Sequence, residues 1–579
     1  MKSTNTTAMA ERTSLIARAE SGDLEAQYAL GRHYWRKKPK NKQKAVHWFR
    51  KAAEQGHAQA QFCLGVRFYK GEGVRKRLTE SVRWFRKAAA QGHMDAQYNL
   101  AWALENGEGC RVDRIEAVDW YRKAARQGDA DAQYNLAYAL DFGEGCAVDK
   151  KAARYWYRKS ANQGNTDAMV NLGVTYRDGD GTPKRLKEAV RWFRRAAELG
   201  DVDGQCCLAH ALYRGEGCAV DEKAAADWYR KAARQGDADA QFGLACCYDE
   251  GRGVRKDYRW AAYWYRKAAE QGDADSQFNL AVSLKRGEGC KADSKAAADW
   301  FRRAARQGDP FHQYYLGLWY RVGRSGRRNY RLAVTWWRKA AAQGYADAQA
   351  LLGDALAGGK GCKADWKEAT YWFRCASAQG DAYAQYSLGF SLYHGKAGRR
   401  NRREAIRWWR KAAEGGHASA QFAMGVELQH GDVCEIDLKG AFRWYRKAAE
   451  QGHDTAQSNL GLMYLDGEGT PRRLKEALRW FHASAEQGNA DAQCSMGYMY
   501  SEGLGVKKDM AQAIRWYRKS AAQGCPPALY SLGEFYRDGD GVRQSTRWAR
   551  YWFRLAADAG YEKAAAELAV LDGRKGEQS

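Results

Sequence analysis

The stretch of sequence that decides the fold runs from Gly128 to Gln163 and reads GDADAQYNLAYALDFGEGCAVDKKAARYWYRKSANQ. Ala132 and Leu136 begin a series of apolar residues with the spacing of one helix face. The turn residues Gly143 to Gly145 then interrupt this series, and a second apolar series of helical spacing follows. The pattern therefore predicts a first helix over about 130–141, a turn, and a second helix that returns antiparallel to the first.

The same pattern recurs every 36 residues through almost the whole chain of 579 residues. Gly recurs from Gly22 to Gly560, Leu or Met from Leu30 to Leu568, and Trp from Trp48 to Trp552. A single helix pair cannot bury its own apolar side, so neighbouring repeats must supply the rest of the core. The sequence thus predicts an all-α fold, an α-solenoid superhelix of about fifteen 36-residue antiparallel helix pairs.

The repeats set the predicted domain boundaries. We expect one solenoid over 13–571, with a half-repeat at 13–20 and a lone helix at 562–571 as caps. Residues 1–12 are predicted to be a disordered polar tail, and 572–579 a C-terminal tail. The first twelve residues contain no apolar core of a signal peptide, and no apolar run is long enough to cross a membrane.

Several repeat positions have a predicted structural role. Gly128 suits the left-handed conformation that ends a helix, and Asp129 suits the cap of the next one. The position after the recurring Leu holds only Gly or Ala, as at Gly173, which indicates that two helices approach closely there. Four histidines share the position of Asp129 and are interpreted as structural: His57, His93, His417 and His453.

Cysteine usage favours a reducing compartment. Six of the 14 Cys fall at one repeat position that elsewhere holds Val or Thr, which is typical of a small buried residue. No C-x-x-C pair is present, so a structural zinc site has little support. We therefore expect reduced thiols, a cytoplasmic location, and no metal or cofactor.

The repeated motif resembles the Sel-one-like repeat family, a relative of the tetratricopeptide repeat. The resemblance rests on Gly128 to Leu136, Gly143 to Gly145 and Trp156 to Lys159, and it extends over about 21–571. It implies a right-handed superhelix of antiparallel helix pairs and a role as an adaptor that assembles protein complexes. It implies no catalytic residues.

Sequence motifs of enzymes are absent. The recurring G-E-G turns lack the context of a phosphate-binding loop, and the Asp178 to Gly181 stretch lacks the acidic residue that completes a calcium loop. No H-E-x-x-H, G-x-S-x-G or paired catalytic carboxylates occur. We therefore predict a protein that is not an enzyme.

The first helices carry one set of candidate binding residues. An aromatic residue follows the recurring Gln in most repeats, and Asn often comes next. If first helices line a concave surface, as in tetratricopeptide arrays, these Asn side chains are placed to bind the backbone of an extended peptide. The alternative is that the aromatic residues fill the core between repeats and that Asn braces a neighbouring helix. The candidate residues are Asn99, Asn135, Asn171 and Asn279.

Basic residues form two patterns. Arg-Lys pairs that follow the Trp-aromatic pair, as at Arg122 and Lys123, are interpreted as a solvated outer face more than as a phosphate track. Three turns lack acids and are strongly basic, at 36–44, 321–331 and 396–403, and they hold much of the net charge of +26. The candidate partner-binding arginines of the last two turns are Arg324, Arg327, Arg328, Arg331, Arg399, Arg400, Arg402 and Arg403.

These patterns predict a non-enzymatic scaffold that binds partner peptides or domains on a concave surface, with basic loops that favour acidic partners. One alternative is a protein that binds nucleic acid or another acidic polymer, although only Tyr330 provides a stacking aromatic in the basic turns. Another is an exported bacterial effector, secreted without a classical signal peptide, that binds host proteins.

Overall fold

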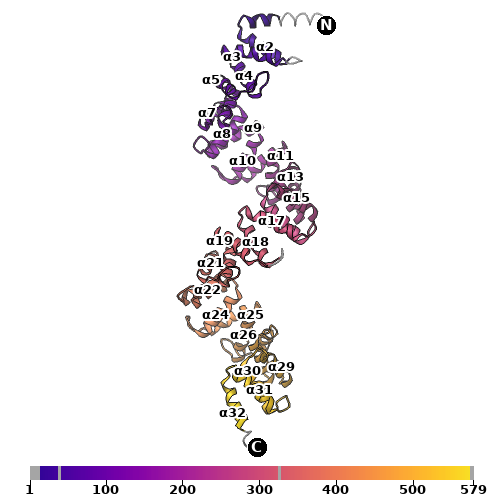
Figure 1. Cartoon of the computed structure of the whole chain (residues 1–579), viewed down its shortest axis with the longest axis vertical. Helices are drawn as coiled ribbons and strands as arrows, with labels where there is room; N and C mark the ends of the chain where they lie inside the picture. Colours follow the sequence, from indigo (N-terminus) through magenta and orange to yellow (C-terminus); the bar gives the residue numbers. More distant parts are fainter. Residues whose placement is uncertain (1–12, 37–40, 324–327, 574–579) are drawn as a thin grey trace. The chain divides into compact units, whose positions relative to one another are not determined.

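The computed structural model describes residues 13–36, 41–323 and 328–573, and this part of the chain is helical apart from short turns. The chain divides into two compact units, Met1–Trp300 and Phe301–Ser579. Within each unit the helices follow one another in sequence order (Figure 1). The predicted all-α solenoid is confirmed. The predicted tail over 1–12 lies outside the described residues, as do Arg324 and Arg327.

Fifteen pairs of helices make up the repeats. The first helices are α2 (Leu24–Arg36), α4 (Ala58–Lys70), α6 (Met94–Asn106), α8 (Ala130–Phe142), α10 (Thr166–Asp178), α12 (Val202–Arg214), α14 (Ala238–Glu250), α16 (Ala274–Arg286), α18 (Pro310–Val322), α20 (Ala346–Ala357), α22 (Ala382–His394), α24 (Ala418–His430), α26 (Asp454–Asp466), α28 (Ala490–Glu502) and α30 (Pro526–Asp538). The second helices are α3 (Lys42–Glu54), α5 (Leu78–Ala90), α7 (Arg114–Gln127), α9 (Lys150–Asn162), α11 (Leu186–Glu198), α13 (Glu222–Arg234), α15 (Tyr258–Gln271), α17 (Ser294–Arg306), α19 (Tyr330–Ala342), α21 (Trp366–Ala378), α23 (Arg402–Glu414), α25 (Leu438–Glu450), α27 (Leu474–Glu486), α29 (Met510–Ala521) and α31 (Thr546–Asp558). Residues 13–20 form a helix before α2, and α32 (Glu562–Gly573) follows the last pair.

The helix ends form as the sequence predicts. The carboxylate of Asp129 accepts a hydrogen bond of 2.7 Å from the backbone N–H of Ala132, which caps α8. Gly128 adopts the left-handed conformation with φ 108° between α7 and α8. His57 caps α4 through its ring Nδ1, at 3.1 Å from the N–H of Ala60. The structural interpretation of the histidines at this position is confirmed.

The position after the recurring Leu is where the two helices of a pair touch. A Cβ atom added to Gly173 of α10 would lie 2.4 Å from the ring of Phe193 in α11. The same arrangement recurs in the second unit, where a Cβ atom on Gly533 would lie 2.5 Å from Phe553. Only Gly or Ala fits at this position because the aromatic ring of the second helix fills the space.

That ring belongs to the residue after the recurring Trp. Tyr157 is fully buried, whereas the preceding Trp156 is half-buried. The recurring Trp therefore does not provide the buried aromatic group in most repeats. The Trp ring lies at the surface of the second helix, where the basic side chain three residues later often covers it, as Lys123 covers Trp120 with 3.6 Å between Nζ and the ring centroid.

Buried glutamines connect successive repeats. The Nε2 group of Gln133, at the start of α8, donates a hydrogen bond of 3.0 Å to the carbonyl of Ala125 in α7. Its Oε1 atom accepts one of 2.9 Å from Gln163, just after the end of α9. This contact joins the start of α8 to the end of α9, so the pair is antiparallel. In the next repeat Met169 and Leu199 replace both glutamines, so the hydrogen-bonded pair changes as a unit.

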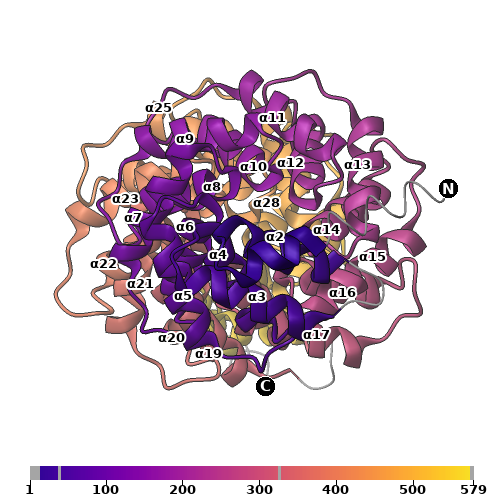
Figure 2. The same cartoon turned by 90° about the horizontal axis from the view of Figure 1, so that it is seen from above.

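The N-terminal unit is curved. Figure 2 shows its even-numbered first helices on the inside of the curve and its odd-numbered second helices on the outside. In agreement with this, α10 contacts α12, and α12 contacts α14. The predicted placement of first helices on the concave side is confirmed for this unit. We call the exposed side of the first helices α6 to α16 the inner face.

Candidate protein-interaction surface

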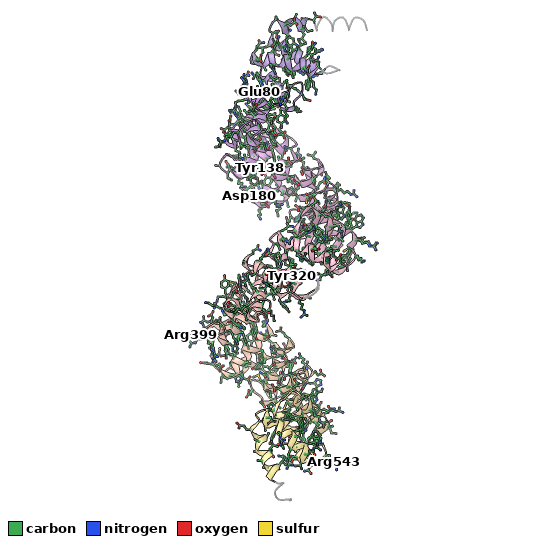
Figure 3. The ribbon with its side chains drawn as sticks, in the orientation of Figure 1. Glu80, Tyr138, Asp180, Tyr320, Arg399 and Arg543 are labelled. Carbon is green, nitrogen blue, oxygen red and sulfur yellow. The ribbon has the colours of Figure 1, made fainter. Side chains whose placement is uncertain are left out.

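The inner face carries large exposed aromatic side chains on α6 and α8. Trp102 is 41% exposed, Tyr138 37% and Phe142 58%. The rings of Tyr138 and Phe142 have centroids 4.6 Å apart, so they form one continuous apolar platform. Figure 3 labels Tyr138 among the side chains of this unit. Exposed aromatic groups on a helix face are typical of surfaces that bind proteins, because they bury much apolar area with few rotatable bonds.

A row of aspartates follows the same face. Each is the second residue of a first helix, so the row contains one carboxylate per repeat. Its members are Asp95, Asp131, Asp167, Asp203, Asp239 and Asp275. We call this set the acidic row.

The acidic row is not required for helix formation. An acid in the first turn stabilises a helix through the helix dipole. In the C-terminal unit, however, the same position holds Phe311 in α18, Ser419 in α24 and Pro527 in α30. Each of these three helices still has 13 residues, the same length as α8. A first helix of this length therefore forms with or without an acid at this position.

Carboxylates of the acidic row repel one another. Partial desolvation and the carboxylates of Asp201 and Asp131 raise the pKa of Asp167. Partial desolvation and nearby carboxylates, with Asp201 and Asp237 first among them, raise the pKa of Asp203. Neither Asp167 nor Asp203 forms an ion pair with another residue that the structure describes. The chain therefore does not neutralise these charges itself.

A groove of about 500 Å³ opens on the inner face between α12 and α14. Small side chains make room for it, since Cys206 and Gly243 occupy positions that hold Tyr134 and Asn135 in α8. Asp239 of the acidic row lines the groove. Arg177 and Arg214 line it as well, and Arg177 pairs with the adjacent Asp178 at 2.8 Å.

The four candidate asparagines are all half-buried on the first helices. Asn99 donates a hydrogen bond of 2.7 Å to the carbonyl of Asp95 in its own helix. Asn171 donates one of 3.5 Å to the hydroxyl of Tyr134 in the preceding repeat. Asn135 also lies beside the hydroxyl of Tyr98, and its hydrogen bond lowers the pKa of that tyrosine against a larger effect of burial. These contacts favour the bracing interpretation, and peptide binding by any of the four asparagines stays a prediction.

Aromatic residues after the buried glutamines lie between repeats. Tyr28 stacks on His57 of the next repeat with 4.7 Å between ring centroids, and Phe62 stacks on His93 at 4.6 Å. This agrees with the interpretation that they fill the inter-repeat core.

The candidate arginines of the basic turns are exposed wherever the structure describes them. Arg328 and Arg331 flank the start of α19, and four arginines precede or begin α23: Arg399, Arg400, Arg402 and Arg403. Figure 3 labels Arg399 at the edge of the C-terminal unit. Arg402 lies over the ring of Tyr393 with 5.0 Å to its centroid. The two turns lie two repeats apart in the sequence. Their use as a joint patch stays a prediction.

The Arg-Lys pairs of the second helices are largely engaged. The Arg of several pairs bonds a Glu of the next repeat, as Arg86 does with Glu116 and Arg374 with Glu404. The Lys covers the Trp ring three residues before it, as Lys231 covers Trp228 at 3.6 Å. These contacts support the interpretation of the Arg-Lys pairs as part of the outer face, and they do not favour the interpretation as a phosphate-binding track.

The acidic row and the buried glutamines are not among the functional or structural residues that the sequence patterns predict. The acidic row is present in the sequence as a recurring Asp-Ala-Gln motif, but its alignment on one face requires the curvature of the unit. The buried glutamines belong to the same motif, and their constancy signals a structural role.

The six Cys of the turn position are half-buried and not fully buried. Cys146 Sγ lies 3.4 Å from the carbonyl oxygen of Ala139, and burial raises the pKa of its thiol.

Stacked antiparallel helix pairs with a 36-residue period, an exposed inner face and hydrogen-bonded inter-repeat contacts define an α-solenoid of the tetratricopeptide-like class. The model of the Sel1 repeat matches fifteen consecutive segments between residues 24 and 561. The chain therefore belongs to the Sel1 repeat family. The matched segments are 24–57, 58–93, 95–129, 130–165, 166–201, 202–237, 238–273, 274–309, 313–345, 346–381, 382–417, 418–453, 455–489, 490–525 and 526–561.

Two solved structures are similar to this chain. A protective antigen of uropathogenic Escherichia coli with an SLR fold has 33% sequence identity and a TM-score of 0.58, over 83% of this chain and 96% of its own. A Sel1 repeat protein from Oxalobacter formigenes has 33% identity and a TM-score of 0.46, over 53% of this chain and 90% of its own. Solenoids of this family are generally non-catalytic and typically serve as protein-interaction scaffolds. No helix among the described residues is long and apolar enough to span a membrane.

Proposed function

We propose that this chain is a non-enzymatic scaffold that binds partner proteins on the inner face of its first helices. The exposed aromatic platform of Trp102, Tyr138 and Phe142 carries the proposal. A rigid array of packed helices presents these groups without a large ordering cost on binding, because the surface exists before the partner arrives.

The basic turns of the C-terminal unit are proposed to favour acidic partners. Arg399 and Arg400 are exposed and lie in a turn without acids, so their charges are available to a partner. We also propose a cytoplasmic location, since all 14 Cys are free thiols and those of the turn position have a raised pKa that disfavours oxidation.

Site-specific photocrosslinking tests the scaffold function. A photoreactive phenylalanine analogue replaces Tyr138 on the inner face, or Tyr155 on the second helix of the same repeat, which is 53% exposed. In the native host we expect defined crosslinked proteins from Tyr138 and few from Tyr155. Equal crosslinking from both positions, or none from Tyr138, would contradict the proposal.

A second candidate function is binding of nucleic acid through the basic turns, which the exposed arginines favour. Its test is binding of RNA and DNA to the purified chain over a range of salt concentrations. The reversals Arg328→Glu, Arg399→Glu and Arg400→Glu abolish binding if the turns form the site. Absence of binding at moderate salt excludes this function.

A further inference from the structure

We propose that the inner face of the N-terminal unit binds an extended, lysine- and arginine-rich segment of a partner protein, with a basic side chain at about every third position. This inference rests on the proposed scaffold function and names the chemistry of one partner. It differs from the acidic partner expected for the basic turns, because it concerns another surface.

The first argument is charge that the chain leaves uncompensated. The protein has a net charge of +26, yet Asp167 and Asp203 make no ion pair with a described residue. Partial desolvation raises the pKa of both groups, and so do nearby carboxylates, first that of Asp201 and then others that include members of the row. A bound cationic segment would relieve this repulsion, and complementary charge of this kind selects partners.

The second argument is the apolar platform beside the acids. Asp131 and Tyr138 lie seven residues apart on α8, which is two helical turns, so both point to the same side. Lysine and arginine carry an apolar stem and a charged end, and they bind to surfaces that combine aromatic rings with carboxylates. Trp102 and Phe142 extend the platform over two repeats.

The groove between α12 and α14 provides depth at the same face. Its volume of about 500 Å³ accommodates a long side chain, and Asp239 and Asp273 line it. Burial, together with the nearby arginines Arg214 and Arg177 among other charges, lowers the pKa of His210 in this groove, so the neutral ring is favoured there at neutral pH. The groove therefore adds the carboxylates of Asp239 and Asp273 and a neutral aromatic ring to the binding surface, beside the two arginines that also line it.

The repeat spacing sets the register of the segment. The first helix α10 contacts α12, and α12 contacts α14; packed helices lie about 8–10 Å apart. An extended chain advances about 3.3 Å per residue, so about three residues span one repeat. One basic residue in three then meets one aspartate of the acidic row per repeat.

The test uses synthetic peptides and the full chain. One peptide of about 18 residues repeats Arg-Ser-Thr, which covers about six repeats at this spacing. A second has the same composition with its arginines in one block, and a third replaces every Arg by Glu. Fluorescence anisotropy measures their affinities at moderate salt. We expect the spaced peptide to bind more tightly than the block peptide, and the acidic peptide not to bind to the inner face.

Matched variants locate the site. Asp167→Asn with Asp203→Asn is expected to weaken binding of the spaced peptide about tenfold, a loss consistent with two partly exposed charge contacts. The control is Asp347→Asn with Asp491→Asn, which changes the same repeat position in the C-terminal unit and is expected to leave affinity unchanged. Tyr138→Ala is expected to weaken binding further, and circular dichroism verifies that each variant is folded.

Four results would overturn the inference. They are absence of binding, equal affinity of the spaced and block peptides, equal weakening in both Asp pairs, and self-association of the chain that the Asp167 and Asp203 variants abolish. The first three leave partner crosslinking at Tyr138 intact, so they separate the failure of this inference from the failure of the scaffold function. The fourth assigns the face to a second copy of this chain.

Discussion

The N-terminal and C-terminal units share their core but differ at their exposed positions. Both units place Gly against an aromatic ring, as Gly173 meets Phe193 and Gly461 meets Phe481. The second position of the first helix, by contrast, is Asp throughout α6–α16 and varied in the C-terminal unit. Because both units build the same helix pairs, packing does not impose the acidic row. A comparison between repeats of one chain thus separates residues that form the fold from residues available for recognition.

The turns between the two helices of a pair also differ along the chain. From α6 to α17 the turns keep a Gly-x-Gly pattern, in which a Cβ on Gly145 would lie 2.3 Å from the backbone oxygen of Arg114. In the C-terminal unit the turn at 396–403 holds Ala397 at the position of Gly145 and becomes basic. The turn that loses the second glycine of the pattern is thus a turn in which positive charge accumulates.

The largest expected effect tests whether the two cores are equivalent. Phe193→Ala and Phe481→Ala each remove a fully buried ring, and each should lower the free energy of unfolding by about 3–5 kcal/mol. Because each repeat contacts mainly its neighbours, we expect the loss of hydrogen-exchange protection to centre on the substituted unit. Urea denaturation and hydrogen exchange measure both quantities. A large loss in one unit and a small one in the other would contradict the equivalence.

An intermediate effect is expected at the glutamine bridges. Gln133→Leu removes the acceptor of Gln163 and should destabilise the N-terminal unit by about 1–3 kcal/mol, since a partly buried amide loses its partner. Gln421→Leu should have the same effect in the C-terminal unit, where Gln421 accepts a hydrogen bond of 2.7 Å from Gln451.

The apolar repeat provides the control for this prediction. Gln133→Met combined with Gln163→Leu reproduces the natural pair Met169 and Leu199 and should recover part of the loss. A double-mutant cycle measures the coupling. Additive losses would show that the two glutamines do not act as a pair.

The smallest expected effect distinguishes the two units at the acidic row. The pKa values of Asp167 and Asp203 are raised above the ordinary 3.8, so their ionisation in the folded chain lowers stability at neutral pH. Asp167→Asn with Asp203→Asn should therefore raise the free energy of unfolding, by less than about 1 kcal/mol because both groups are largely exposed. Asp347→Asn with Asp491→Asn should change it less.

The pH dependence of this difference gives a second measurement. Below about pH 3.8 the carboxyls are protonated in both the folded and the unfolded chain, so the gain from the Asn substitutions should vanish. It should grow as the pH rises through the folded pKa values, and added salt should reduce it. A gain that is constant from pH 3 to pH 7 would exclude charge repulsion as its cause.

Much of the fold follows from local signals. The helix of 130–141 is found as Ala130–Phe142, with Gly128 and Asp129 in their predicted roles. Helix ends are predictable because a cap and a left-handed glycine act over three or four residues. The small residue at Gly173 also indicated close helix contact, because only a steric limit excludes larger side chains so consistently.

The candidate site was predicted less completely. The basic turns are identified from charge alone; Arg399 and Arg400 lie in an exposed turn, Arg402 and Arg403 begin α23, and their role in binding stays a prediction. The asparagines are present on the first helices but make hydrogen bonds within the chain, as Asn171 does with Tyr134. The aromatic platform of Tyr138 and Phe142 was missed, since these residues interrupt no period and belong to no repeated motif.

The sequence by itself determined the period, the helix pairs, their caps and the position of closest approach, because each depends on contacts within one repeat. Only the tertiary structure decided that Tyr157 and not Trp156 fills the core, that Gln133 bridges α7 and the end of α9, and that the aspartates of α6–α16 form one row. These features depend on the rotation between successive repeats. That rotation results from side-chain packing between residues about 30 or more positions apart, which no local pattern specifies.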